Sequence, residues 1–336
     1  MSSLISPADI AQLERALELA ERGRGSTAPN PIVGCVMVGS DGSVVGEGWH
    51  ERAGGPHAER MALDVAGVNA SRATAYVSLE PCAHHGRTPP CSRALIDAGV
   101  SRVVIGALDV DPRTALLGVA ALREAGVVVQ VAEGAIAQRA RRQNEGFRRW
   151  VRDGRPFVVY KAAVTLDGRV AAAGGDARWV SGEESRRRVH ELRAACDAVA
   201  VGMGTVRREN PLLTARDVDA VVQPRRLAFG KGPLPDDSEL ELRTAPIEEE
   251  LAVLAAEGVQ TLLLEGGPTL AGAFLRSGLI DKLLLFVAPK LIGGDDAPSL
   301  FGGPGALTMA DAIDTQACDV EVLGSDVLLT SYLAEV

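Results

Sequence analysis

Apolar runs rich in valine and isoleucine alternate with helical patterns through the first half of the chain. Strand-like runs include "IVGCVMVG", "ATAYVSLEP" and "RVVIGALD", and the helical patterns "HAERMALDVAG" and "ALLGVAALREAG" fall between such runs. Strands that alternate with helices predict a central sheet covered on its faces. A longer helical pattern, "AIAQRARRQNEGFRRWV", leads into the charged break "RDGRPF", where we expect a domain boundary.

A second α/β pattern begins after this break. Strand-like runs recur as "FVVYKAAVTLDGRVAA", "AVAVGMGTV", "RRLAFG", "QTLLLEGG", "KLLLFVAPKLIG" and "DVEVLGSDVLLTSYL". Helical patterns fall between several of them, at 183–195, 247–257 and 269–277. The stretch "PLPDDSELELRTAPIEEE" is interpreted as an acidic surface loop and helix start. We therefore predict two α/β domains, over residues 1–152 and 156–336.

The composition fits two globular domains that act on a small molecule. A chain of 336 residues exceeds one typical domain, and its 46% hydrophobic content can supply a sizeable core. Aromatic residues make up only 4%, so we expect that core to be mostly alanine, valine and leucine. The net charge of -9 argues against broad binding to nucleic acid, which requires a basic face.

The sequence shows no membrane or secretion signal. Near the N-terminus apolar residues are interleaved with Asp9, Glu14, Glu18 and Glu21, so no apolar signal region is present. The longest apolar runs fall far short of the ~20 residues that span a bilayer. Five cysteines, an odd number, do not suggest a disulfide framework. We expect a cytoplasmic protein without membrane partners.

A potential metal centre combines two separated stretches, "GGPHAERMAL" and "LEPCAHHGRTPPC". His57, Cys82 and Cys91 offer one imidazole and two thiolates, the ligand types that hold zinc in a tetrahedron. Three protein ligands leave the fourth position for water, which is typical of a catalytic zinc site. Glu59, two positions after His57, could move a proton between that water and a departing ammonia.

This order of residues resembles the H-x-E and P-C-x-x-C signature of zinc deaminases. The cysteine spacing differs, because eight residues separate Cys82 from Cys91. His84 or His85 could instead close the site as a fourth ligand of a structural zinc. Glu59 alone could be a carboxylate favoured by the helix dipole. The remaining cysteines are interpreted as buried or incidental: Cys35, Cys196 and Cys318.

Five stretches together resemble a known enzyme family. They are "TAPNPIVGCVMV", "GEGWHERAGGPHAE", "VSLEPCAHHGRTPPC", "KAAVTLDGRVA" and "LLLEGGPTLAGAFL", in order from about Ser26 to the C-terminus. The family is that of the bifunctional riboflavin biosynthesis enzymes, which are diaminohydroxyphosphoribosylaminopyrimidine deaminases and 5-amino-6-(5-phosphoribosylamino)uracil reductases. The eight-residue cysteine spacing belongs to the pattern of this family, so the departure from the general signature favours this member.

The resemblance implies a cytidine-deaminase-like α/β/α domain followed by a dihydrofolate-reductase-like α/β domain. It implies Zn2+ and NADPH as cofactors. The implied reactions are hydrolytic deamination of 2,5-diamino-6-(5-phosphoribosylamino)pyrimidin-4-one, then reduction of its ribosyl chain to a ribityl chain. It also leads us to expect a homodimer or higher homo-oligomer.

The resemblance assigns contacts in both domains. In the first domain, Asn30 and Arg87 are expected to bind the phosphorylated pyrimidine. In the second, expected substrate contacts are Lys161, Ala177, Leu213, Arg216 and Glu265, with Arg216 suited to the ribose 5-phosphate. Expected NADPH contacts are Ala163, Trp179, Thr205, Glu209, Gly267, Pro268, Thr269, Leu270, Ala271, Gly272 and Ala273. The Gly-Gly turn before a helix suits close approach to a phosphate.

Three features depart from the family pattern. Ala177 stands where a serine is usual, Glu209 where an aspartate is usual, and the loop after Pro112 lacks its glycine-rich character. These departures leave open a deaminase with a degenerate or re-purposed reductase half. Two other classes are a deaminase of nucleic acid, disfavoured by the acidic, aromatic-poor composition, and a binding module with structural zinc, for which Glu59 would be dispensable.

Overall fold

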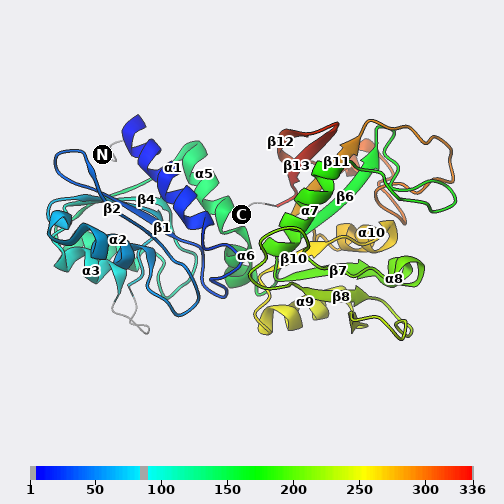
Figure 1. The fold of residues 1–336 in the computed structure, drawn as a ribbon, viewed down its shortest axis with the longest axis horizontal. Helices are drawn as coiled ribbons and strands as arrows, with labels where there is room; N and C mark the ends of the chain where they lie inside the picture. The colour runs from blue at the N-terminus through cyan, green and yellow to red at the C-terminus, as the bar shows by residue number, and fades with distance from the viewer. Residues whose placement is uncertain (1–4, 84–89, 335–336) are drawn as a thin grey trace. The chain divides into compact units, whose positions relative to one another are not determined.

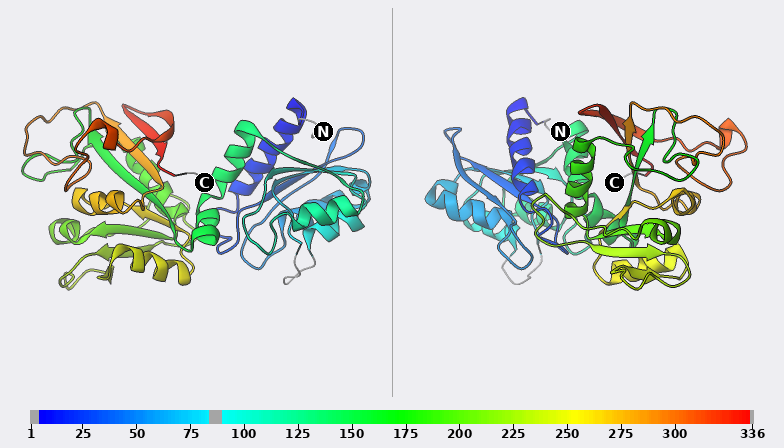
Figure 2. Two further views of the ribbon diagram at one scale, coloured as in Figure 1. Left: turned by 180° about the vertical axis from the view of Figure 1, so that it is seen from behind. Right: turned by 45° about the vertical axis from the view of Figure 1, so that its right-hand side comes forward.

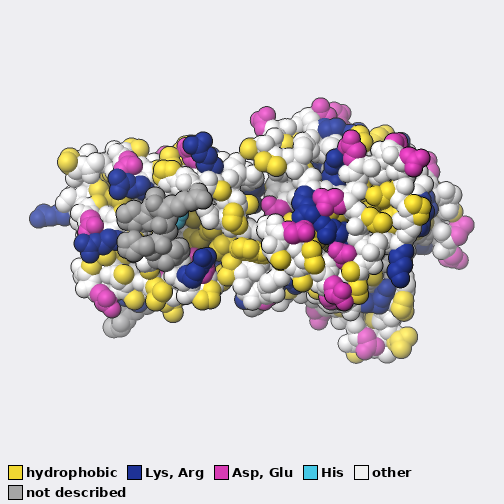
Figure 3. Space-filling model, turned by 90° about the horizontal axis from the view of Figure 1, so that it is seen from below, with side chains coloured by type: hydrophobic (Ala, Val, Ile, Leu, Met, Phe, Trp, Pro, Cys, Tyr) yellow, Lys and Arg dark blue, Asp and Glu magenta, His cyan; other side chains and the backbone are white. Residues whose placement is uncertain are grey.

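The structure is a computed structural model that describes residues 5–83 and 90–334. The chain divides into two compact units, one up to Asp153 and one from Gly154, each with its own sheet (Figure 1). No helix in the described ranges is long and apolar enough to cross a membrane. Basic and acidic side chains are interspersed on the face drawn in Figure 3.

The first unit contains a five-stranded sheet in the order β2-β1-β3-β4-β5. β1 is antiparallel to β2 and β3, whereas β3, β4 and β5 run parallel. The strands are β1 (Gly34–Val38), β2 (Val44–Trp49), β3 (Thr74–Leu79), β4 (Arg102–Ala107) and β5 (Val128–Val131). The helices are α1 (Pro7–Glu21), α2 (Ala58–Ala66), η1 (Gly67–Ala70), α3 (Cys91–Asp97), α4 (Leu117–Glu124), α5 (Gly134–Gln143) and α6 (Glu145–Asp153).

Helices cover both faces of this sheet (Figure 2). On one face, side chains of α2, α3 and α4 such as Ala62, Leu95 and Leu122 form a buried cluster with the sheet. On the other face, α1 and α5 contribute a second cluster that includes Leu13 and Ala137. The cores consist mostly of alanine, valine and leucine, as the composition predicts.

The long helix predicted before the domain boundary is two helices, α5 and α6, with a break at Asn144. The Asn144 side chain accepts a hydrogen bond from Ile32 N and donates one to Ile32 O, both at 2.9 Å. An asparagine that bonds distant backbone competes with continuation of a helix. The break therefore follows from a contact that helical periodicity does not reveal.

The second unit contains an eight-stranded sheet in the order β12-β13-β11-β6-β10-β7-β8-β9. The pairs β12–β13 and β13–β11 are antiparallel, and all other neighbouring strands run parallel. The strands are β6 (Phe157–Thr165), β7 (Ala198–Gly202), β8 (Arg225–Phe229), β9 (Glu241–Arg243), β10 (Thr261–Leu264), β11 (Lys282–Ala288), β12 (Gln316–Leu323) and β13 (Asp326–Tyr332). The helices are α7 (Glu183–Ala195), α8 (Met203–Glu209), α9 (Ile247–Ala256), α10 (Pro268–Arg276) and η2 (Met309–Asp311).

The α/β character expected for both halves is confirmed, with local differences. The acidic stretch interpreted as a loop contains the short strand β9, whose side chains are mostly exposed. The run "AVAVGMGTV" changes from strand to helix at Met203. The last run folds into a β12–β13 hairpin, because Gly324 adopts a left-handed φ of 62° at its turn.

Close contact between α2 and β2 positions the start of α2. A Cβ atom on Gly48 would lie 2.5 Å from Ala58 O and 2.6 Å from Ala62 N. Gly46, on the same strand face, makes a similar approach to Ala62 O. Because neither glycine has a side chain, the helix backbone lies directly on the strand, and the residues that open α2 are held against the sheet.

We predict that Gly48→Ala destabilises the first unit by about 1–3 kcal/mol, because the added methyl group overpacks a backbone contact. The displaced α2 should also lower zinc affinity, since His57 immediately precedes it. Thermal unfolding and metal analysis of the purified full-length chain would measure both effects. Gly305→Ala is the control, because nothing lies within 4 Å of its Cβ position. Wild-type stability and zinc content in Gly48→Ala would contradict the prediction.

Candidate active sites

Three predicted metal ligands converge in the first unit. His57 is the N-cap of α2, Cys82 follows β3, and Cys91 is the first residue of α3. Their ligand atoms all lie within 4.8 Å of one another. His57 Nδ1 is 3.3 Å from Cys91 Sγ and 3.6 Å from Cys82 Sγ. The fold thus brings together three side chains that are far apart in sequence.

This arrangement fits tetrahedral zinc. Zinc bonds of about 2.3 Å to sulfur and about 2.0 Å to nitrogen place tetrahedral ligand atoms about 3.5–3.8 Å apart. The two nitrogen–sulfur separations are close to this range. The same region of the sequence includes His84, His85 and Arg87, which lie outside the described residues, so the alternative of a fourth protein ligand and the expected Arg87 contact stay predictions.

The Cys82 and Cys91 thiols interact with each other in a way that suits binding of a cation. Cys82 accepts hydrogen bonds from the Cys91 side chain and from Cys91 N, at the start of α3, and these with His57 lower its pKa. The same thiol–thiol hydrogen bond, with burial, raises the pKa of Cys91. The two sulfurs are therefore joined through one hydrogen-bonded proton. A divalent cation between them would displace that proton and pair with both sulfurs.

Glu59 lies on the first turn of α2 and is only 3% exposed. Burial, together with the nearby charge of Cys82, raises the pKa of its carboxyl group to about 7. A carboxyl group with a pKa near neutrality can both accept and release a proton at physiological pH. The side chain predicted to transfer protons is therefore buried within the metal centre.

His50 is a site residue that the sequence interpretation missed. Its Nδ1 lies 2.9 Å from Pro56 O, so Nδ1 must carry the proton, and Nε2 then accepts from Asn30 Nδ2 at 3.2 Å. The ring packs edge-on against His57 at 5.3 Å. His50 thereby orients the Asn30 amide beside the metal centre. Its only signal in the sequence is rarity, as one of five histidines.

The loop that departs from the family pattern is tied to the metal centre through Glu80. This buried carboxylate accepts hydrogen bonds from Asp109 N at 3.3 Å, Leu116 N at 3.1 Å and Val119 N at 3.2 Å. Glu80 also precedes the Pro81–Cys82 pair. One side chain thus connects the Cys82 segment to the start of α4 and defines the shape of the altered loop.

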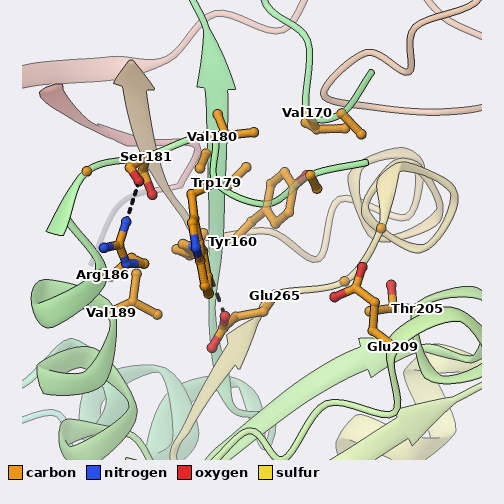
Figure 4. Close-up of a pocket in the computed structure, with 18 of the residues that line it drawn as sticks. Tyr160, Val170, Trp179, Val180, Ser181, Arg186, Val189, Thr205, Glu209 and Glu265 are labelled. Atoms are coloured by element: carbon orange, nitrogen blue, oxygen red, sulfur yellow. Dashed lines mark hydrogen bonds and ion pairs between the residues drawn. The ribbon is translucent and has the colours of Figure 1, made fainter. Parts of the chain in front are cut away.

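The second unit contains a cavity of about 1570 Å³ at the carboxyl ends of its parallel strands (Figure 4). Many of the predicted contacts line it: Lys161, Ala163, Ala177, Trp179, Thr205, Glu209, Arg216, Glu265, Gly267, Pro268 and Thr269. The other predicted positions do not line it: Leu213, Leu270, Ala271, Gly272 and Ala273. Ala271 is fully buried, and Leu270 packs near Gly202 and Gly266, behind the glycine turn.

A buried ion-pair network stands at one side of this cavity. Glu265 accepts two hydrogen bonds from Arg193, at 2.6 and 2.9 Å, and its Oε2 is 4.0 Å from Lys161 Nζ. Burial raises the pKa of Glu265, but Arg193 and Lys161 outweigh it and keep the carboxylate ionised. Burial lowers the pKa of Lys161. Sequence interpretation missed Arg193, since an arginine on a helix has no distinguishing pattern.

Backbone donors and an arginine lie along the same cavity. Gly267 is the N-cap of α10, and its Cβ position would be 3.4 Å from Thr205 Oγ1. Free N–H groups at a helix start attract phosphate oxygens. Arg216 lines the cavity with no ion-pair partner among the described residues, and its backbone nitrogen lies 3.2 Å from His190 Nδ1. Both features suit anionic groups of a ligand.

The chain matches two known protein families over successive regions. Residues 7–107 match the family described as the cytidine and deoxycytidylate deaminase zinc-binding region. Residues 156–329 match the RibD C-terminal domain. One match falls in each unit, and their order agrees with the order of domains expected from the sequence.

Relatives extend over nearly the whole chain. Riboflavin biosynthesis protein RibD of Escherichia coli is 40% identical over 94% of this chain and 97% of its own length. The RibD protein of Mycobacterium tuberculosis H37Rv is 41% identical, covering 94% of both chains. Among solved structures, Acinetobacter baumannii RibD has a TM-score of 0.86 at 37% identity, covering 97% of this chain and 98% of its own. The predicted fold class is confirmed.

We predict that Cys82→Ser and Cys91→Ser each lose most of the bound zinc, because each removes a thiolate from a site of three protein ligands. Metal analysis of the purified chain would measure zinc content. Cobalt substitution would report the thiolate ligands as charge-transfer absorption. Cys318→Ser is the matched control, because Cys318 is exposed and lies in the other unit. Full zinc content in both ligand variants would refute the assignment.

Proposed function

The chain belongs to the RibD family of riboflavin biosynthesis proteins, and we propose that the two sites described above carry its two reactions. It is a bifunctional enzyme that deaminates 2,5-diamino-6-(5-phosphoribosylamino)pyrimidin-4-one and then reduces the ribosyl chain with NADPH. The observation that carries this assignment is the convergence of His57, Cys82 and Cys91 beside the buried Glu59. A degenerate reductase half is not favoured, since the second cavity retains an organised network of charged groups.

Deamination is assigned to residues 1–152. Zinc, when bound by His57, Cys82 and Cys91, supplies a Lewis acid that activates water for attack on the pyrimidine carbon. Glu59 accepts the proton of the attacking water and delivers it to the amino group that leaves as ammonia. Its buried position on the first turn of α2, two residues after His57, suits both transfers. We assign Asn30, oriented by His50, to hydrogen bonds with the polar edge of the base.

Reduction is assigned to residues 156–336. NADPH supplies the hydride for the ribosyl C1. The bond between C1 and the ring oxygen breaks in this reduction, and Lys161, paired with Glu265 and with a pKa lowered by burial, can donate the proton that the ring oxygen takes up. Arg193 holds the Glu265 carboxylate in place, while the N-terminus of α10 and Arg216 bind phosphate groups of the cofactor and of the substrate. We also propose a cytoplasmic location, where free cysteines remain reduced.

We predict that Glu59→Gln abolishes ammonia release, with a loss of at least about a hundredfold in kcat, because the amide cannot transfer the proton. Zinc content should be unchanged, as Glu59 is not a ligand. Ammonia release and zinc content are measured on the same full-length protein. Deamination at the wild-type rate would refute the role of Glu59.

The same variant provides an internal control for the second unit. Supplied with the deaminated pyrimidine, Glu59→Gln should oxidise NADPH at the wild-type rate, measured as the loss of reduced nicotinamide absorbance. Oxidation of NADPH without deamination would show that the two reactions use separate sites. No NADPH oxidation in the wild-type chain would overturn the reductase assignment alone.

We further propose that the chain forms a homodimer through one face of the second sheet. Val320 and Val322 on the edge strand β12 are 66% and 72% exposed. They stand opposite Leu329 and Val327 on β13, which in turn stand opposite Leu285 and Val287 on β11. Directly opposed residues share a sheet face, so six apolar side chains form one surface without charged groups.

A second copy of the chain is the partner that suits this surface. The opposite face of the hairpin is occupied, because Glu321 pairs with Arg188 of α7. An apolar, uncharged face can pack against its own copy across a two-fold axis without charge repulsion. Covering it would also protect the exposed edge strand from aggregation. The surface thus supports the homo-oligomer expected from the family.

We predict that Val322→Asp dissociates the dimer, because a two-fold axis would bring two buried carboxylates together. Sedimentation analysis should show the wild type at twice the 35.1 kDa chain mass and the variant at the chain mass. Val68→Asp is the control, since Val68 is 91% exposed in the first unit. A monomeric wild type, or a dimeric Val322→Asp, would contradict this interface.

A further inference from the structure

One wall of the reductase cavity is a segment without helix or strand. Ala177, Trp179, Val180, Ser181 and Gly182 all line the cavity, and the segment leads directly into α7. Figure 4 shows Trp179 and Ser181 on this wall, near Arg186 of α7. Irregular backbone beside a ligand site must be held by contacts from elsewhere in the fold.

Asp326 supplies such a contact from the other end of the unit. It is the first residue of β13, is 1% exposed, and lies at the hairpin turn whose residues Gly324 and Ser325 also line the cavity. One carboxylate oxygen accepts hydrogen bonds from Gly182 N at 2.7 Å and from Ser185 Oγ at 2.6 Å. A single side chain therefore joins the C-terminal hairpin, the wall and the start of α7.

The Asp326 carboxylate takes the place of a capping side chain for α7. The N-cap residue Gly182 has no side chain, so α7 lacks a cap from its own sequence. An anion at a helix N-terminus satisfies free N–H groups and interacts favourably with the helix dipole. Among the described residues no basic side chain pairs with Asp326. The hydrogen bonds from Gly182 and Ser185 therefore compensate the buried carboxylate, and the same bonds hold the start of α7 in position.

The position of α7 matters for both ligands of the cavity. Arg186 lies over the Trp179 ring at 4.8 Å and donates to Ser181 O at 2.7 Å, while Arg193 holds Glu265. A shift at the start of the helix would therefore move the wall and the Arg193–Glu265 pair together. Lys161, whose Nζ is 4.0 Å from Glu265 Oε2, would then lose the carboxylate that pairs with it.

We propose that Asp326 is a positioning residue of the reductase site. It fixes the 177–182 wall and α7, so that NADPH and the ribosyl substrate bind in the correct positions relative to each other. The proposal rests on the proposed assignment of the reduction to this cavity. It concerns a residue that does not itself line the cavity. Asp326 acts through hydrogen bonds to Gly182 and Ser185 rather than by contact with reacting atoms.

The chain offers a matched control on the same hairpin. Arg188 of α7 forms a two-point ion pair with Glu321 of β12, at 2.7 and 2.9 Å. This pair also ties α7 to the hairpin, but it is exposed and neither residue lines the cavity. Glu321→Gln therefore weakens the attachment of the hairpin without touching the wall.

The test is steady-state reduction by full-length Asp326→Asn, with NADPH and the deaminated pyrimidine varied in turn. Loss of a charge-assisted hydrogen bond to the wall should raise both KM values by about tenfold, with a smaller change in kcat. Direct titration of NADPH binding should show a matching loss of affinity. Ammonia release by the first unit and the oligomeric state should be unchanged. Glu321→Gln should keep wild-type KM values.

Other outcomes are also decisive. Wild-type KM values in Asp326→Asn, or an equal rise in Glu321→Gln, would overturn the proposal. If Asp326→Asn leaves the second unit unfolded, Ser185→Ala removes only one of the two bonds, and its KM values should rise about threefold; no rise in that variant would refute the proposal. Absence of NADPH oxidation in the wild-type chain would instead refute the reductase assignment itself.

Discussion

Three ligand atoms from segments up to 34 residues apart must lie within 4.8 Å of one another, and the first unit is organised around that requirement. His57 and Cys91 stand at the starts of α2 and α3, which pack on the sheet, and Cys82 follows β3, a strand of the sheet itself. The sheet and its helices therefore set the distances between the ligands. The close approach of α2 to β2 at Gly48 is part of the same geometry.

Both units use helix starts to stabilise buried negative charge. In the first, Cys91 N at the start of α3 donates to the Cys82 sulfur, and Glu80 accepts from Leu116 N and Val119 N at the start of α4. In the second, Asp326 accepts from Gly182 N at the start of α7. Helix starts have N–H groups without partners in the helix, so they can compensate a carboxylate or thiolate that burial removes from water.

The two sites differ in how they control protons. Without metal, burial outweighs the attraction of His57 and raises the pKa of the Glu59 carboxyl group to about 7, and a zinc ion on the neighbouring ligands would lower that pKa. Glu265 has two cationic neighbours, Arg193 and Lys161, and stays ionised. The first carboxyl group can therefore accept and release a proton. The second stays charged, pairs with Lys161 and raises the pKa of that lysine against the effect of burial. Similar burial thus leads to different roles because the neighbouring charges differ.

The sequence by itself determined the features that depend on rare residue types or regular periodicity. The convergence of His57, Cys82 and Cys91 was predictable because histidine and cysteine are uncommon and their spacing is distinctive. The helix α7 was predicted at its observed bounds because its pattern is periodic. Only the tertiary structure decided the roles of common residues that act over long distances in sequence. Asn144 breaks a helix by bonding Ile32, and Arg193 becomes a site residue by meeting Glu265. Such roles arise from contacts between segments, which local pattern cannot contain.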